Sequence, residues 1–543
     1  MTEGITSRSL RIASLLVAAI VVLLGFDGTL HWDEPGYLYA GIYQTVDQIL
    51  RAEVQPSGIP DFTTGKLLHV LFVHLVYSLV GSSTATALLV AGLYTLMLAS
   101  SLWVTSRITA RLLSAGSAAA SAGTLAVALT PVVAYLAFKT LADIPAFFLG
   151  CVTTYAILRS ATRASAAWIG IGIISLAMAA MTKTPAVILP ASFVAAALLF
   201  PVASLDRRRT FLTGLAVGLA AGAVTLLVLS ALSISLDRFL GSSDLLSKHS
   251  PLVPKLMHIA ITAGVVWVLL PFSLLTTRRP ELRFFWAWFA VATLPFLLLF
   301  EHVEPRYLPA SLVPMAGIAA LAIEAAWSRA RPLFNRQRPL ALAAASVSAV
   351  LLVTAHALAM KVMPHEVDVF ELRKSLAGLD AIHGNNRSVI LASSRFTDFH
   401  ILRVLWPERA VYCVDDTPLL VTPRSENSAA VLSETYMQGR QIESLDGLHQ
   451  LDGPFVYFGF EQTFAPVNLA AIMDLARPGL GARLLASFDL LNHLEMSWVW
   501  TSDQLLLEPI STSAHYRVFD VQLKMPAGQP AERAVTGAVP PVT

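Results

Sequence analysis

The chain has 543 residues, of which 55% are hydrophobic and only 14% are charged. Soluble globular proteins carry about 25% charged residues, so this composition excludes a soluble enzyme and predicts a polytopic α-helical membrane protein. The formal net charge is +2, and no basic cluster is interleaved with aromatic residues outside short loops. This charge pattern argues against a nucleic-acid partner.

The apolar segments predict about eleven membrane-spanning helices, because a span needs about 20 mostly apolar residues. The predicted spans are 10–30, 84–106, 115–137, 144–160, 165–182, 185–203, 211–233, 256–276, 283–301, 308–327 and 339–360. The first span has no small-residue cleavage site after it, so we expect an uncleaved helix instead of a signal peptide. The shorter run at 66–81 is interrupted by Lys66, His69 and His74. We expect a juxtamembrane or re-entrant helix there.

The arginines of the predicted loops indicate the orientation. With a cytoplasmic N-terminus, every short cytoplasmic loop is basic, whereas the other loops carry scattered single cations. The basic loops hold Arg8 and Arg11; Arg107 and Arg111; Arg159 and Arg163; Arg207, Arg208 and Arg209; Arg278, Arg279 and Arg283; and Arg329, Arg331, Arg336 and Arg338. This positive-inside pattern predicts a plasma (inner) membrane protein. It places outside the cytoplasm residues 27–83, the turns near 138–143, 183, 234–255 and 301–307, and the C-terminal region.

The chain changes character after residue 360. Short β-type runs lie at 388–392, 410–414, 455–460 and 516–521, with helix-like stretches at 396–405 and 467–475 between them. This alternation predicts an extracytoplasmic α/β domain over 361–525, following a transmembrane domain over 1–360. The last residues, 526–543, are rich in Pro, Ala and Gly and predict a disordered tail.

Charged residues gather in the turns that this topology places on the external face. A charge within hydrocarbon costs roughly 2.5–3.5 kcal/mol, so carboxylates at a membrane edge tend to have a partner or a function. Cations can hold a lipid phosphate as a leaving group, and a carboxylate can take a proton from an attacking hydroxyl. The gathered residues are Asp33, Glu34, Lys66, Lys139, Asp143, Lys183, Glu301, His302, Glu304, Arg306 and Tyr307.

Each of these residues also has a purely structural interpretation. Asp33 and Glu34 could lie solvated in an interfacial loop, and Lys139 and Lys183 could be snorkelling anchors. Asp143 could cap the helix that starts with Ile144-Pro145. In the last turn, the group around His302 could bind a divalent ion, although we expect neither a metal site nor another cofactor.

The order of these motifs resembles the polyprenyl-phosphate-dependent glycosyltransferases of the GT-C fold. The branch in question contains protein O-mannosyltransferases, lipid A aminoarabinose transferases and rhizobial lipopolysaccharide galacturonosyltransferases. The matching motifs are Asp33-Glu34 followed by Tyr37, Gly65-Lys66, Asp143-Ile144-Pro145, Thr182-Lys183-Thr184-Pro185 and Arg306-Tyr307. The chain departs from the pattern at Leu67-Leu68, which replace prolines, and at Pro309, which comes one residue early. The resemblance covers about residues 10–320 and leaves the C-terminal region unexplained.

The resemblance implies an inverting transfer of a sugar from a polyprenyl-phosphate donor to an extracytoplasmic glycolipid, polysaccharide or protein. Asp33 would be the general base, and Glu34 and Asp143 would assist or position it. The donor would be bound by Lys66, Lys183, Arg306, Tyr307 and Tyr37. The chain contains no Asp-x-Asp, the usual mark of a metal-bound nucleotide sugar, which favours a lipid-linked donor.

Two other classes of protein remain open at this stage. A transporter or flippase for a lipid-linked glycan would explain the spans and the cations, but it is expected to carry charged residues near mid-membrane, and few fall there. A membrane-anchored sensor or assembly subunit would leave the gathered carboxylates and cations unexplained. The sequence identifies neither the sugar nor the acceptor.

A reporter that is active only outside the cytoplasm tests the predicted orientation. Fused after residue 365, it should be active, because the arginine clusters hold the preceding loops in the cytoplasm. Fused after Arg208, it should be silent. The opposite pattern would move every candidate site residue to the cytoplasmic face.

Overall fold

The computed structural model describes a helical region and a set of strands. The described residues are 29–31, 34–51, 64–113, 117–234, 236, 239, 255–256, 259–260, 262, 264, 266–273, 278–299, 305–336, 366–368, 389–392, 403–404, 411–414, 441–442, 455–462, 480–489, 494–500, 505–511 and 514–523. Most of the predicted first span, the last span at 339–360 and the tail at 526–543 lie outside them.

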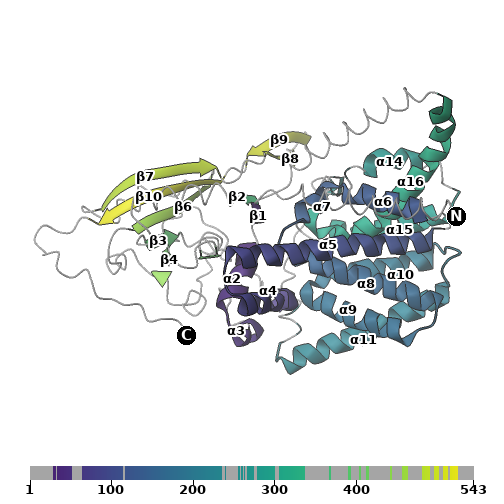
Figure 1. Cartoon of the computed structure of the whole chain (residues 1–543), viewed down its shortest axis with the longest axis horizontal. Coiled ribbons are helices and arrows are strands. Elements are labelled where there is room, and N and C mark those ends of the chain that lie inside the picture. Colours follow the sequence, from purple (N-terminus) through teal and green to yellow (C-terminus); the bar gives the residue numbers. More distant parts are fainter. Residues whose placement is uncertain are drawn as a thin grey trace, which may run out of the picture.

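The helical region is a bundle (Figure 1). Its helices are α5 (Thr84–Leu112), α6 (Ser117–Ala128), α8 (Asp143–Thr162), α9 (Ala166–Thr182), α10 (Ile188–Leu199), α11 (Arg207–Ala231), α14 (Val266–Ser273), α15 (Pro280–Leu298) and α16 (Pro309–Arg336). Of the described helices, 5 are long and apolar enough to cross a membrane: α5, α8, α11, α15 and α16. The protein is therefore a multi-pass membrane protein, as predicted, and the total of about eleven spans stays a prediction.

The prediction of a single span over 115–137 is wrong. After α6 ends at Ala128, a separate short helix begins, α7 (Pro131–Leu136). Pro131 has no amide hydrogen, and the residue before a proline is disfavoured in the helical conformation. Thr130 is accordingly extended, with φ −73° and ψ 146°. The chain therefore breaks here, and this break leads into the turn that carries several candidate site residues.

Two other predicted helices are present in the structure, one with the expected bounds and one that is longer. The predicted helix at 66–81 is confirmed as α4 (Leu67–Val80). Helix α16 begins where the span at 308–327 was expected but continues to Arg336. A helix can extend beyond its apolar part, because its backbone hydrogen bonds do not depend on lipid.

Helices α6 and α16 pack so closely that only glycine fits at residue 123. A Cβ atom there would lie 2.2 Å from the carbonyl oxygen of Ala316 and 2.7 Å from the backbone nitrogen of Ala320. Small residues let helix backbones approach in this way within a membrane. The contact holds α16 in place, and with it the short helix η5 (Pro305–Tyr307) that precedes α16.

The described strands from residue 389 onward form two sheets. Four strands coincide with predicted β-type runs: β3 (Val389–Ala392), β4 (Val411–Val414), β6 (Phe455–Gln462) and β10 (Ala514–Leu523). They belong to a 6-stranded sheet of order β5-β4-β3-β6-β10-β7, completed by β5 (Gln441–Ile442) and β7 (Leu480–Asp489). Strand β3 is parallel to β4 and β6, whereas β10 is antiparallel to β6 and β7.

The second sheet pairs β8 (Leu494–Trp500) with β9 (Leu505–Ser511), and the sequence analysis did not predict these strands. Apart from residues 403–404, the predicted helix-like stretches lie outside the described residues. The α/β domain over 361–525 therefore stays a prediction.

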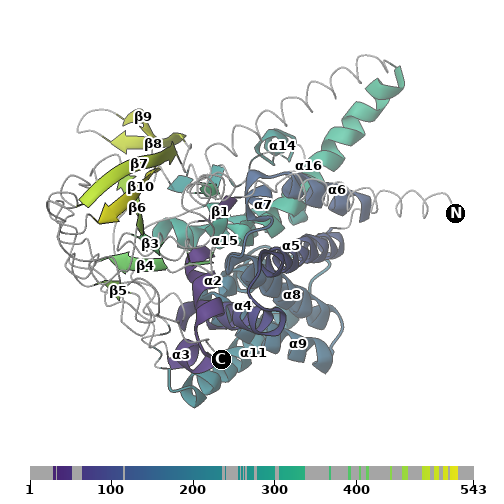
Figure 2. The same cartoon turned by 60° about the vertical axis from the view of Figure 1, so that its left-hand side comes forward.

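Among the described residues, a strand pairing and the contacts of one tyrosine join the C-terminal region to the start of the chain. Strand β1 (Thr29–His31) pairs antiparallel with β2 (Glu366–Asp368). At the end of α2 (Glu34–Tyr43), the Tyr43 hydroxyl donates to the carbonyl oxygen of Arg403 at 2.7 Å, and the Arg403 guanidinium lies 4.3 Å from the centre of the Tyr43 ring. Figures 1 and 2 show α2, α3 (Val46–Arg51) and α4 at the end of the bundle that faces the strands.

Replacing Gly123 by Ala should lower the thermal unfolding temperature in detergent. The added methyl group forces the backbones of α6 and α16 apart, and overpacking of this kind costs about 1–3 kcal/mol. Gly92→Ala in α5 is the control, because a Cβ atom at Gly92 meets nothing within 4 Å. Alanine favours a helix over glycine, so the control should be neutral or slightly stabilised. Equal unfolding temperatures for the two variants would contradict the close contact.

Candidate active site

The turn between α7 and α8 carries the polar residues Lys139 and Thr140, and Asp143 follows it as the first residue of α8. Phe138, which opens the turn, has a φ of 60°, a left-handed conformation that is uncommon for a bulky residue. Its backbone N–H donates to the Thr95 hydroxyl of α5 at 2.9 Å. The conformation thus redirects the chain, and α5 holds the turn in place.

Glu34 is completely buried at the first position of α2. Its Oε1 accepts a hydrogen bond from the backbone N–H of Thr140. A buried carboxylate needs such partners, and the start of a helix also favours negative charge. The solvated-loop interpretation is therefore wrong for Glu34, which instead ties α2 to the turn before α8. Its sequence neighbour Asp33 lies outside the described residues.

Asp143 and Lys183 form an ion pair between the start of α8 and the end of α9. The side chain of Asp143 is 5% exposed and that of Lys183 is 15% exposed. Lys183 follows α9 directly and precedes the short helix η2 (Thr184–Val187). Because its ammonium group bonds a buried carboxylate, Lys183 is not a simple snorkelling anchor.

Tyr307 joins this ion pair to Arg306. The Lys183 ammonium nitrogen lies 4.5 Å from the centre of the Tyr307 ring, a cation–π distance. From the other side, Arg306 Nη2 donates to the Tyr307 hydroxyl at 3.0 Å. Arg306 is 4% exposed. Asp143, Lys183, Tyr307 and Arg306 therefore form one continuous chain of contacts from three separate segments.

Lys66 and Tyr37 form a second part of the site. The Lys66 ammonium nitrogen lies 4.8 Å from the centre of the buried Tyr37 ring. Lys66 ends the short helix η1 (Thr64–Lys66), which packs against α9, the helix that leads to Lys183. The packing of η1 therefore brings the two parts of the site to the same end of the bundle.

His69 packs against Tyr37 in this second part of the site. Its ring meets Tyr37 edge to face, with 4.7 Å between the ring centres, and its Nδ1 lies 2.6 Å from the Tyr94 hydroxyl of α5. Burial lowers the pKa of His69, and the positive charges of Lys66 and Lys183 lower it further. His69 is therefore a neutral side chain that both lysines influence.

Lys139 is also buried, at 1% exposure, with its ammonium nitrogen 5.9 Å from the centre of the Tyr135 ring. The snorkelling interpretation is therefore wrong for Lys139. Sequence reasoning also missed the supporting residues Tyr94 and Thr95. Their only signal was the presence of polar groups inside an otherwise apolar span.

No group of three His, Cys, Asp or Glu side chains within the described ranges could hold a metal ion. The candidate metal ligands Glu301, His302 and Glu304 lie outside those ranges. The question of metal dependence therefore stays with the sequence-based expectation.

Comparison with solved structures identifies the fold. The crystal structure of ArnT from Cupriavidus metallidurans bound to undecaprenyl phosphate has a TM-score of 0.56 and 13% identity, over 93% of this chain and 97% of that one. Its apo state has a TM-score of 0.54 and 14% identity, over 94% and 97%. The archaeal oligosaccharyltransferase AglB from Archaeoglobus fulgidus, with an inhibitory peptide and a dolichol-phosphate, has a TM-score of 0.49 and 12% identity, over 84% and 69%.

No family model matches the sequence, and no curated protein matches it by sequence. At identities this low, the likeness establishes the fold alone. This chain shares the fold of ArnT, which is a GT-C fold, as its motifs predicted.

A double-mutant cycle measures the Asp143–Lys183 interaction. Asp143→Asn and Lys183→Met should each lower the unfolding temperature, because each leaves a charge in a largely buried place without its partner. The double variant should lose less than the two single losses together, by a coupling of about 0.5–3 kcal/mol.

The exposed pair Asp206–Arg209, with side chains 48% and 62% exposed, is the control. Asn at 206 still caps α11, and a solvated pair contributes little, so Asp206→Asn and Arg209→Met should show almost no coupling. Additive losses at Asp143 and Lys183 would show that the two charges do not stabilise each other.

Proposed function

We infer that this chain is an integral-membrane glycosyltransferase that moves a sugar from a polyprenyl-phosphate donor to an extracytoplasmic acceptor, with inversion. The continuous contact chain Asp143–Lys183–Tyr307–Arg306 is the observation that carries this inference. It places cations from separate helices around one end of the bundle, beside the buried carboxylate Glu34. The GT-C fold supports the proposal, and so does the undecaprenyl phosphate bound to ArnT.

The charge of the site suits a lipid phosphodiester. Among the described side chains, four cations (Lys66, Lys139, Lys183 and Arg306) accompany two carboxylates (Glu34 and Asp143). Cations therefore outnumber carboxylates among these described side chains, which favours an anionic ligand. We propose that Lys66, Lys183 and Arg306 hold this phosphate without a metal ion, with Tyr37 and Tyr307 orienting the cations.

The proposed reaction is a single displacement. The acceptor hydroxyl oxygen attacks the anomeric carbon opposite the phosphate, and the bond between that carbon and the phosphate oxygen breaks. Polyprenyl phosphate leaves with the electron pair, and its new negative charge is stabilised by the surrounding cations. The hydroxyl proton passes to Asp33. Glu34, held by Thr140, positions this part of the chain, and Asp143 positions Lys183.

The remaining features of the proposal follow from the topology. The site and the C-terminal region both lie outside the cytoplasm, at a plasma (inner) membrane. The region over 361–525 meets the same end of the bundle through Tyr43 and Arg403. We propose that it helps to receive the acceptor, whether a glycolipid, a polysaccharide or a protein.

Lipid-linked sugars extracted from cells lacking the protein test this function. One polyprenyl-phosphate sugar should accumulate in these cells, and expression of the wild-type protein should return it to its normal level. With that sugar as donor, purified Asp33→Asn protein should turn over about 10²–10⁴-fold more slowly, because Asn cannot take the proton. Donor affinity should change little, since the cations hold the phosphate.

Three outcomes would contradict parts of this proposal. Normal turnover by Asp33→Asn would exclude Asp33 as the base and make Asp143 the next candidate. A loss explained by a lower unfolding temperature would return Asp33 to a structural role. A wild-type protein that moves the lipid-linked sugar across a bilayer without cleaving it would be a flippase.

A further inference from the structure

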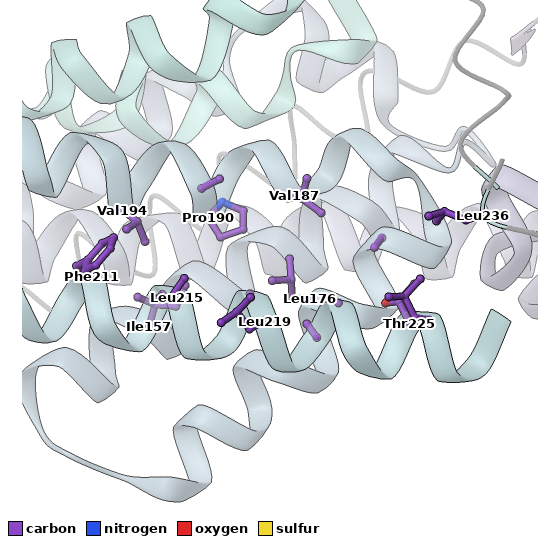
Figure 3. Close-up of a pocket in the computed structure, with 17 residues that line it drawn as sticks. Ile157, Leu176, Val187, Pro190, Val194, Phe211, Leu215, Leu219, Thr225 and Leu236 are labelled. Carbon is purple, nitrogen blue, oxygen red and sulfur yellow. The ribbon is translucent and has the colours of Figure 1, made fainter. Parts of the chain in front are cut away.

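A long apolar cavity runs along α11 and is lined by none of the charged residues of the candidate site. Its volume is about 650 Å³, and α8, α9, η2, α10 and α11 contribute its walls. Apart from Thr225, every side chain that lines it is apolar, or the residue is glycine. Figure 3 shows Phe211 and Leu236 at its two ends. Phe211 and Thr225 lie fourteen residues apart on α11, which is about 21 Å along the helix axis.

The cavity begins close to the phosphate-binding cations of the proposed function. Val187 lines it, and Val187 ends the short helix η2 that starts directly after Lys183. Four residues of such a helix rise about 8 Å. In Figure 3, Val187 lies between Val194 and Leu236, and Phe211 lies beyond Val194. A lipid with its phosphate at Lys183 would therefore enter the cavity at Val187 and run along α11 toward Phe211.

Three glycines of α11 face this cavity at one-turn intervals, and packing explains only one of them. A Cβ atom at Gly214 would lie 2.5 Å from Val194 Cγ2, so a larger residue would clash there. At Gly218 and Gly222, a Cβ atom would meet no atom of the described residues within 4 Å. Glycine inside a helix costs about 1 kcal/mol relative to alanine. Helix packing therefore gives no reason for glycine at these two positions, whereas an occupant of the cavity does.

The cavity is open along the side of α11. Gly218 and Gly222 are exposed, and so are their neighbours Leu219 and Leu226. A chain can enter from the bilayer without any opening of the bundle. The two open glycines leave notches in the wall, one turn apart. A straight acyl chain has no branches to fill these notches, whereas an isoprenoid chain carries a methyl branch on every unit.

We propose that Gly218 and Gly222 make this cavity selective for the methyl-branched isoprenoid chain of the lipid-phosphate donor. The inference rests on the proposed function, which supplies the phosphate end of the same ligand. In this view Lys183 and Arg306 hold the phosphate, and the wall of α11 distinguishes a polyprenyl phosphate from the other anionic lipids of the membrane. The donor class is therefore recognised at two separate places.

The test measures the binding of two lipids to the full-length protein in detergent. Undecaprenyl phosphate is the branched probe, and hexadecyl phosphate is the straight-chain probe. The variants are Gly218→Leu and Gly222→Leu, at positions where an added Cβ atom meets no described atom within 4 Å. Gly92→Leu on α5 is the matched control, because it also has open space and does not line the cavity. The unfolding temperatures of all three variants show that each protein is folded.

The proposal expects the wild-type protein to prefer undecaprenyl phosphate. Gly218→Leu and Gly222→Leu should weaken undecaprenyl phosphate binding roughly 10–200-fold, the range by which one extra group in a filled hydrophobic pocket changes recognition. Hexadecyl phosphate binding should change much less, and Gly92→Leu should match the wild type for both lipids.

Other results would overturn the proposal in recognisable ways. Equal losses of binding for the two lipids would show that the cavity accepts any membrane lipid chain and does not select the isoprenoid chain. Wild-type undecaprenyl phosphate binding by both cavity variants would show that the chain lies elsewhere, while leaving the proposed function intact. A wild-type protein that binds neither lipid phosphate would overturn the proposed donor itself.

Discussion

The site depends on the pairing of charges that are buried within a membrane protein. A carboxylate removed from water is tolerated only when hydrogen bonds or opposite charges compensate it. Glu34 meets this requirement through the backbone N–H of Thr140, and Asp143 meets it through Lys183. Each of these bonds joins segments far apart in the chain. The polar groups therefore hold α2, the turn before α8 and the end of α9 in one arrangement.

Helix α5 supports this arrangement through two hydrogen bonds. Two consecutive residues of that helix serve the two sides of the site: Tyr94 bonds His69, and Thr95 accepts from Phe138. Consecutive residues on a helix point about 100° apart, so one helix can reach both segments at the same level. On the other side, the glycine contact between α6 and α16 fixes the segment that carries Arg306. Apolar packing thus positions the charged groups.

The lipid environment explains the division between a charged end and an apolar wall. Cations that gather at one end of the bundle suit a headgroup, whereas the cavity along α11 suits only hydrocarbon. A ligand that is anionic at one end and apolar along its length matches both. The C-terminal region meets the same end of the bundle through Tyr43 and Arg403.

The sequence by itself determined the membrane class, most of the helix positions and the order of the charged motifs. Apolar length and arginine distribution depend on the bilayer, and a single chain records them directly. The motifs also predicted the GT-C fold, which the solved structures confirm. Four strands of the C-terminal region coincide with predicted runs. Short segments rich in β-branched and aromatic residues predict a strand from local sequence alone.

Only the tertiary structure decided which charges meet and what supports them. The hydrogen bond from the backbone of Thr140 to Glu34 and the burial of Lys139 depend on neighbours distant in sequence. The same is true of His69, whose pKa is lowered by burial and by the charges of Lys66 and Lys183. Glycine looks alike at 214, 218 and 222 in the sequence, yet only the packed helices show that one contacts Val194 and two face open space. Spacing along a chain records local periodicity, whereas partners and cavities come from contacts between segments.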